Sequence, residues 1–142
     1  MNHFEPASVD AADAVSADPE FAGRWLDEVK GRRLNVALAG DGPTAATRAA
    51  LKVLGRSEQV AIKRVEFRLS YLLGLSEEVG RDMRARRFPA SLIAESSVCL
   101  QENVVELAVR RSAPVDAEAT VTDRYGTPAV RITRQVVESR YT

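Results

Sequence analysis

Two arginines stand in apolar rows where a charged side chain is unexpected. Residues Val79–Leu100 are predicted to form two strands joined by a turn at residues 88–90. Because residues two apart in a strand share a face, Arg81 and Arg134 each fall in a row of apolar side chains. The apolar members of these two rows are Val79, Met83 and Ala85, and Val130, Ile132 and Val136.

A guanidinium on an apolar face is costly to desolvate unless an anion meets it. Arginine stays charged at physiological pH and matches a carboxylate through two parallel hydrogen bonds. Two inward arginines would suit a small ligand with two carboxylates, and each contact contributes about 1.5–3 kcal/mol. Two alternatives remain open. An internal acid such as Glu95 or Glu66 neutralises each arginine, or the side chain reaches solvent from a strand end.

The single histidine, His3, and the single cysteine, Cys99, restrict the other catalytic chemistry. His3 lies in residues 1–17, an alanine-rich and acidic stretch that we expect to be a disordered tail. A Ser–His–Asp triad, a Cys–His pair and a histidine-based zinc site are therefore not expected. One cysteine cannot form an intrachain disulfide or a multi-cysteine metal site. No metal and no cofactor are expected.

The charges of the chain balance, with 20 lysines and arginines against 20 aspartates and glutamates. Such a balance does not favour a nucleic-acid or membrane-surface partner. No apolar run approaches the roughly 20 residues of a membrane span, and the N-terminus lacks the pattern of a secretory signal. We expect a cytoplasmic protein in which residues 18–142 form a single domain.

Helix signals come early in the chain and strand signals follow them. Residues 18–20 are typical of a helix start, and apolar residues then recur every four positions. A second helix is predicted from Thr44 to a cap at Gly55. Its buried face comprises Thr47, Ala50, Leu51 and Leu54. The strands that follow are predicted over residues 59–71, 79–100 (a hairpin), 104–110 and 119–137 (a hairpin). The expected fold is α+β, with N-terminal helices packed on an antiparallel sheet of about five to six strands, and no internal repeat is evident.

Four motif-bearing segments follow one another along the chain, and their order is informative: ALAGDGPTAATRAAL, VAIKRVEFRL, GRDMRARRFPASLIAESSVCL and YGTPAVRITRQVV. Over roughly residues 24–137 this order resembles the chorismate lyase-like superfamily. That group includes chorismate pyruvate-lyases and the related effector-sensing domains of bacterial regulators. The resemblance implies the same α+β architecture.

The resemblance also implies roles for particular residues. The family arginine that grips the substrate carboxylate falls on Arg81, and the family AES segment is similar to Ala94-Glu95-Ser96. The family glutamate of the last strand falls on Thr133 or Arg134, and neither is an acid. The candidate catalytic residues are Arg81 and Glu95, and the candidate substrate-binding residues are Arg81, Arg134, Thr133, Ser96 and Met83.

Two functions of different class remain open. The first is a chorismate lyase-like protein that binds a small anionic aromatic or pre-aromatic carboxylate, with or without elimination of pyruvate from it. The alternative is a non-catalytic small-molecule-sensing or partner-binding domain of the same fold, which the missing glutamate favours. A cyclase or isomerase with an Asp/His pair is disfavoured, because the only histidine lies in the expected tail. The polar face of the strand from residue 60 to 69 leaves a homodimer open.

Overall fold

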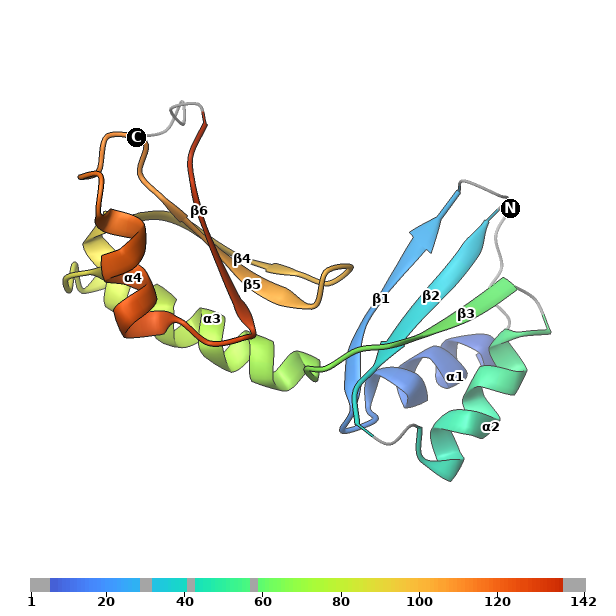
Figure 1. Ribbon diagram of the computed structural model, residues 1–142. Coiled ribbons are helices and arrows are strands. Elements are labelled where there is room, and N and C mark those ends of the chain that lie inside the picture. The colour runs from blue at the N-terminus through green and yellow to red at the C-terminus, as the bar shows by residue number, and fades with distance from the viewer. Residues whose placement is uncertain (1–5, 29–31, 41–42, 57–58, 137–142) are drawn as a thin grey trace. The chain divides into compact units, whose positions relative to one another are not determined.

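The chain forms two compact units in a computed structural model, residues 1–70 and residues 71–142, where we had expected one domain over residues 18–142. The structure describes residues 6–28, 32–40, 43–56 and 59–136 (Figure 1). No helix in these ranges is long and apolar enough to cross a lipid bilayer.

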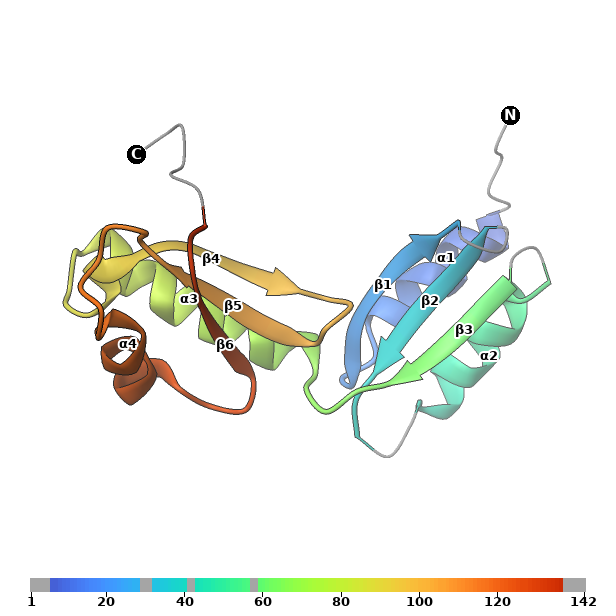
Figure 2. The same ribbon diagram turned by 45° about the horizontal axis from the view of Figure 1, so that its top comes forward.

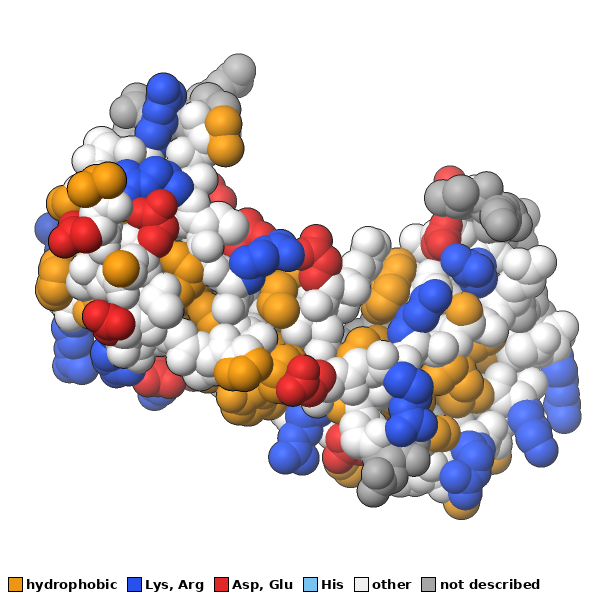
Figure 3. Space-filling model, viewed as in Figure 1, with side chains coloured by type: hydrophobic (Ala, Val, Ile, Leu, Met, Phe, Trp, Pro, Cys, Tyr) orange, Lys and Arg blue, Asp and Glu red, His pale blue; other side chains and the backbone are white. Residues whose placement is uncertain are grey.

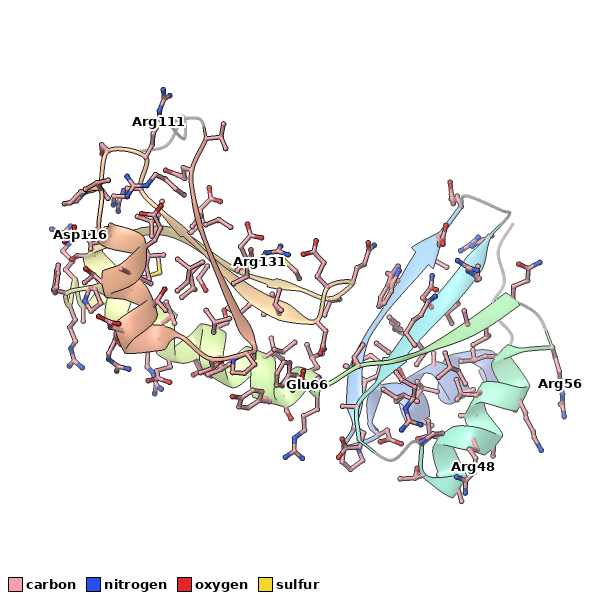
Figure 4. The ribbon with its side chains drawn as sticks, in the orientation of Figure 1. Arg48, Arg56, Glu66, Arg111, Asp116 and Arg131 are labelled. Carbon is pink, nitrogen blue, oxygen red and sulfur yellow. The ribbon has the colours of Figure 1, made fainter. Side chains whose placement is uncertain are left out.

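Unit 1 is a three-stranded sheet with two helices on one face (Figure 2). Its elements are α1 (Pro6–Ser16), β1 (Phe21–Asp27), β2 (Arg33–Leu38), α2 (Ala45–Leu54) and β3 (Gln59–Arg64). The strand order is β1-β2-β3, in which β1 runs antiparallel and β3 parallel to the central β2. Alternate residues of β2 face the helices and form the core with them. The buried members of this core are Ala11, Val15, Leu34, Val36, Leu38, Ala50, Leu51 and Leu54.

Unit 2 has the same order of elements. They are α3 (Leu69–Arg84), a short 3₁₀ helix η1 (Ala90–Leu92), β4 (Ile93–Cys99), β5 (Val104–Val109), α4 (Ala117–Tyr125) and β6 (Val130–Arg134). The strand order is β4-β5-β6, again with one antiparallel and one parallel pair around the central strand. The peptide bond between Phe88 and Pro89, just before η1, is cis.

The two units are structural repeats. Leu34 pairs with Val60 in the parallel ladder of unit 1, and Val105 pairs with Val130 at the same place in unit 2. A register irregularity lies at the start of the antiparallel pair in both units, after Phe21 and after Ile93. The last strands share the pattern V-x-I-x-R, at residues 60–64 and 130–134. We had found no internal repeat, because beyond this short pattern the two halves share topology rather than residues.

The structure confirms an α+β fold and contradicts the expected single antiparallel sheet of five to six strands, since each unit has its own mixed three-stranded sheet. The predicted second helix is confirmed as α2: its buried residues match the prediction, and Thr44 caps its N-terminus by accepting a hydrogen bond from the amide of Thr47. The strand expected over residues 104–110 is confirmed as β5.

Five other expectations were wrong. The helix expected after residue 18 is strand β1, because apolar residues four apart fit one face of a strand as well as of a helix. The tail expected over residues 1–17 contains α1, which buries Ala11 and Val15 against unit 1. The strand expected over residues 59–71 ends at residue 64, and the first halves of the two predicted hairpins are helices α3 and α4. His3 lies outside the described residues.

Candidate functional site

A groove runs between helix α3 and strand β4 of unit 2, with a volume of about 750 Å³. We call it the α3–β4 groove. It is lined by Leu73, Ser76, Glu77, Gly80, Met83 and Arg84 from α3, and by Ala94, Glu95 and Ser96 from β4. Three of the predicted site residues, Met83, Glu95 and Ser96, therefore meet in one place. They do so across a helix and a strand rather than across a hairpin.

Helix α3 presents one face to the groove and another to the core. The lining residues recur every three or four positions from Leu73 to Arg84, which is the repeat of a helix face. Leu72 and Val79 lie on a different side of the helix and are buried. Gly80 sits mid-way along the lining face, and a Cβ added there would meet only the Nη1 of Arg84, at 3.3 Å. Because glycine has no side chain, the groove is deeper at this position.

Strand β4 is an edge strand, and part of its backbone points away from the sheet. The amide of Arg110 donates to the carbonyl of Leu92 at 2.9 Å, which fixes the alternation of the β4–β5 ladder. With the recorded register, the amide and carbonyl groups of Ser96 and Val98 face the outer edge. No strand in the described residues pairs with that edge. The Ser96 hydroxyl lies 3.3 Å from that of Ser76 on α3.

The charged side chains that face the groove are Glu77 and Arg84 of α3. Glu95 borders the groove, but it alternates with Ser96 along β4 and pairs with Ala108, so its carboxylate lies on the polar face of the sheet with Glu106 and Thr133. One carboxylate and one guanidinium do not provide the two cations that the dicarboxylate ligand expected from the sequence would need. Leu73, which is 51% exposed, adds an accessible apolar surface. Such a mixed lining beside free backbone groups suits a polypeptide better than a small dianion.

Arg81 does not lie where we predicted. It stands in the last turn of α3, with an exposed side chain outside the groove lining. The predicted apolar row with Met83 existed only for a strand, because residues two apart lie on different sides of a helix. Arg84, three residues further on, is the arginine that α3 contributes to the groove.

The Arg134 guanidinium is bound by a carboxylate and by backbone carbonyls of the same unit. Its Nε donates to Oε2 of Glu118 at 3.1 Å, and its Nη2 donates to the other oxygen of that carboxylate at 2.5 Å. Further donated bonds reach the carbonyls of Arg111, Ala113 and Pro114, in the loop between β5 and α4. The hydrogen bond from Arg134 lowers the pKa of Glu118, and the same bond raises the pKa of Arg134. The alternative of an internal acid, weighed from the sequence, is correct here, but the acid is Glu118 rather than Glu95 or Glu66.

We call this set of bonds the arginine clamp, and unit 1 has a simpler counterpart of it. Arg64 ends β3 as Arg134 ends β6, and its Nη2 donates to the carbonyl of Gly40, in the loop between β2 and α2. In both repeats, an arginine at the end of the last strand thus ties down the loop that leads into the second helix. The shared V-x-I-x-R pattern was the sequence signal for this role, and it was missed.

Thr133 lies in a second cavity of unit 2, of about 390 Å³, on which Glu95 and Arg134 also border. Glu106 in this lining accepts a hydrogen bond from the Nε of Arg131 at 3.1 Å. Arg131 also pairs with Glu102, so this polar face of the sheet largely satisfies its own charges.

A third cavity of about 270 Å³ lies beside η1 and carries two guanidiniums with no carboxylate in its lining. It is lined by Met83, Arg86, Ala90, Ser91, Ile93 and Arg110. This cavity offers an arginine pair of the kind expected from the sequence, although it uses different arginines.

Helices α3 and α4 are joined by Tyr125, whose hydroxyl donates to Oδ2 of Asp82 at 2.5 Å. Burial, together with the hydrogen bond and charge of Asp82, raises the pKa of Tyr125 to about 12. Arg124 lies over the Tyr125 ring, 4.7 Å from its centroid, and pairs with Glu78 and Asp82. This cluster holds the helix that carries the groove lining.

No group of three or more metal-binding side chains occurs in the part of the chain that the structure describes. No protein-family model matches the sequence, and no curated protein matches it significantly. The site must therefore be interpreted from its own geometry.

Proposed function

We propose that this protein is a non-catalytic binding module whose α3–β4 groove receives an extended peptide segment of a partner protein. The observation that carries the proposal is the outer edge of β4, whose free backbone groups at Ser96 and Val98 open beside a groove of about 750 Å³. A peptide laid along this edge would add a fourth strand to the sheet through main-chain hydrogen bonds. Its alternate side chains would enter the groove, where Leu73 and Met83 offer apolar contacts.

The carboxylate of Glu77 restricts which peptides fit the groove. It favours a segment with a lysine or arginine among the side chains that enter the groove. Apolar neighbours of that basic residue would contact Leu73 and Met83. Pairing at an exposed strand edge is a general hazard for proteins, and edges are usually blunted by charged side chains, proline or β-bulges. In β4 such features lie only near its start, at the register irregularity after Ile93 and at Glu95, and residues 96–99 carry no charge and no proline.

The experiment is selection of peptides from a random library on the immobilised protein, followed by binding assays on three forms of it. Gly80→Leu fills the groove floor with a branched side chain, whereas Gly74→Leu adds the same side chain to the same helix outside the groove lining. We expect the selected peptides to bind the wild type and Gly74→Leu but not Gly80→Leu. Selection of no peptide that depends on residue 80 would contradict the proposal.

The second candidate is binding of a small carboxylate, with or without the elimination that the sequence resemblance implies. The cavity that holds Arg86 and Arg110 favours it, because two guanidiniums face that cavity without a carboxylate in its lining. Incubation with chorismate, with assay of pyruvate and 4-hydroxybenzoate, tests turnover. Thermal stabilisation by hydroxybenzoates that Arg110→Ala abolishes would support binding without turnover, and the absence of both effects would eliminate this candidate.

A further inference from the structure

The face of the unit 1 sheet opposite its helices holds a buried side-chain amide, that of Asn35, which has no hydrogen-bond partner in the described residues. Leu34, Val36 and Leu38 of β2 face the two helices, so Arg33, Asn35 and Ala37 face the opposite side. Asn35 is 1% exposed. Within the described residues, neither its Oδ1 nor its Nδ2 has a hydrogen-bond partner.

Arg33, on the same face of β2, also has a buried side-chain atom without a hydrogen-bond partner in the described ranges. The Nε of Arg33 is also buried without a partner in the described chain, although its Nη2 donates to Oδ2 of Asp27 at 2.7 Å. Asp27 is the residue opposite Arg33 on β1, and Trp25 is the residue opposite Asn35. Side chains directly opposite on adjacent strands are close enough to touch. A half-buried indole, an amide and a guanidinium edge thus share one patch.

Unit 2 provides an internal comparison for this patch. The residue equivalent to Asn35 in the repeat is Glu106, and its parallel-strand neighbour is Arg131, which donates to it. The corresponding neighbour of Asn35 is Ala61, which has no polar side-chain atom. The repeat that carries Glu106 therefore satisfies this position internally, and the repeat that carries Asn35 does not.

Buried polar atoms without partners are rare in folded proteins, because each one keeps its desolvation penalty. An asparagine at such a position suggests a group from outside the chain that completes its hydrogen bonds. The free atoms are two donors, Asn35 Nδ2 and Arg33 Nε, and one acceptor, Asn35 Oδ1. A ligand must therefore offer both an acceptor and a donor, and an amide group offers the two side by side. A carboxylate offers acceptors only.

We propose that this patch of Trp25, Arg33 and Asn35 is a binding site for an amide group, either a side-chain carboxamide or a peptide bond, placed against the Trp25 ring. The site is independent of the α3–β4 groove, because it lies in the other unit and uses a face of the sheet rather than an edge. The Asn35 side-chain oxygen and nitrogen are buried in the free protein, so binding requires a neighbouring side chain on this face, such as that of Trp25, to move aside. Trp25 is the only tryptophan of the chain, so its fluorescence reports on this site alone.

The test titrates the full chain with acetamide, N-methylacetamide and acetate. We follow Trp25 fluorescence and the NMR signals of the Asn35 side-chain NH₂ group. Both amides should change these signals saturably, and acetate should not. Tighter binding of acetamide would assign the site to a side-chain carboxamide, and tighter binding of N-methylacetamide would assign it to a peptide bond.

Two variants complete the test. Asn35→Leu should raise the denaturation midpoint of the unliganded protein and abolish the amide response, with Asn35→Ala as a second variant that lacks the amide. The matched change Glu106→Leu in unit 2 should lower the midpoint, because it breaks the pair with Arg131. If neither amide produces a saturable change, or Asn35→Leu responds as the wild type does, the proposal is overturned. A lower midpoint for Asn35→Leu would mean that ordered water already satisfies the amide, and would overturn it too.

Discussion

Replacement of Asp18 by asparagine is expected to destabilise unit 1 strongly, because this carboxylate joins three segments of the fold. Asp18 is 6% exposed and lies between α1 and β1. Its Oδ1 accepts from the amide of Glu20 at 2.8 Å. Its Oδ2 accepts from the amide of Thr44 at 3.1 Å and from the hydroxyls of Thr44 and Thr47 at 3.2 and 2.5 Å.

The magnitude follows from these bonds. A hydrogen bond to a charged group contributes about 1.5–3 kcal/mol, and contributions within one cluster do not add fully. In Asp18→Asn the amide nitrogen would take the place of Oδ2 and face the donating amide of Thr44, or the flipped side chain would face that of Glu20. We expect a loss of about 2–3 kcal/mol in the free energy of unfolding. With a urea m value of about 1–2 kcal/mol/M, the midpoint would fall by about 1–3 M.

The assay is urea denaturation followed by Trp25 fluorescence, which reports on unit 1. Asp13→Asn is the matched control, because Asp13 is an exposed carboxylate of α1 in the same unit. That control should leave the free energy of unfolding within about 0.5 kcal/mol of the wild-type value. An Asp18→Asn protein as stable as the control would refute the reasoning.

The same carboxylate predicts a pH dependence. Burial acts to raise the pKa of Asp18, but the hydrogen bonds from Thr47, Glu20 and Thr44 outweigh it and lower the pKa below the usual 3.8. A lowered pKa in the folded state contributes stability that is fully present above the unfolded value and is lost as the pH falls through the folded value. The stability gap between wild type and Asp18→Asn should therefore be constant at neutral pH and narrow below about pH 4. A gap that widens on acidification would show that the sign is wrong.

Three further predictions concern other parts of the fold. Arg134→Met should lower the melting temperature of unit 2 and restore the pKa of Glu118 toward its usual value, as NMR titration of that carboxyl would report; an unchanged pKa would contradict the clamp. Tyr125→Phe should destabilise unit 2 by about 1–2 kcal/mol in thermal unfolding, because it leaves the buried side of Asp82 without its donor, and equal stability would argue against the α3–α4 link. Gly80→Ala and Gly74→Ala should each stabilise α3 by up to about 1 kcal/mol in urea unfolding, because alanine favours a helix and neither Cβ meets the backbone. A loss of stability for Gly80→Ala alone would mean that the Arg84 side chain cannot move away from the new Cβ.

The sequence predicted best where local signals agreed. Thr44 to Gly55 combined a capping residue, a periodic apolar face and a glycine stop, and α2 has those bounds within a residue. The prediction from the sequence was wrong where the same apolar residues fitted both the two-residue repeat of a strand and the 3.6-residue repeat of a helix. Residues 79–85 alternate like a strand, yet they continue a helical pattern that begins near residue 69.

The candidate site was only partly predictable for the same reason. Glu95 and Ser96 were placed correctly on a strand, but the face opposite them came from a helix that had been assigned as a strand. Arg134 lies half-buried on the face of β6 that it shares with Val130 and Ile132. Its partner Glu118 was hidden, because the segment that carries it was assigned to a loop and a strand rather than to α4. A charge in an apolar row signals a partner, but only the fold says whether that partner is a ligand or the chain itself.

The central claim is that the outer edge of β4 pairs with a peptide strand. Amide hydrogen exchange at Ser96 and Val98 tests it most directly, with a peptide selected on the wild-type protein. The account predicts that both amides exchange rapidly in the free protein, become protected when the peptide is added, and stay unprotected in Gly80→Leu at the same peptide concentration. Protection elsewhere in the chain, with Ser96 and Val98 unchanged, would contradict it.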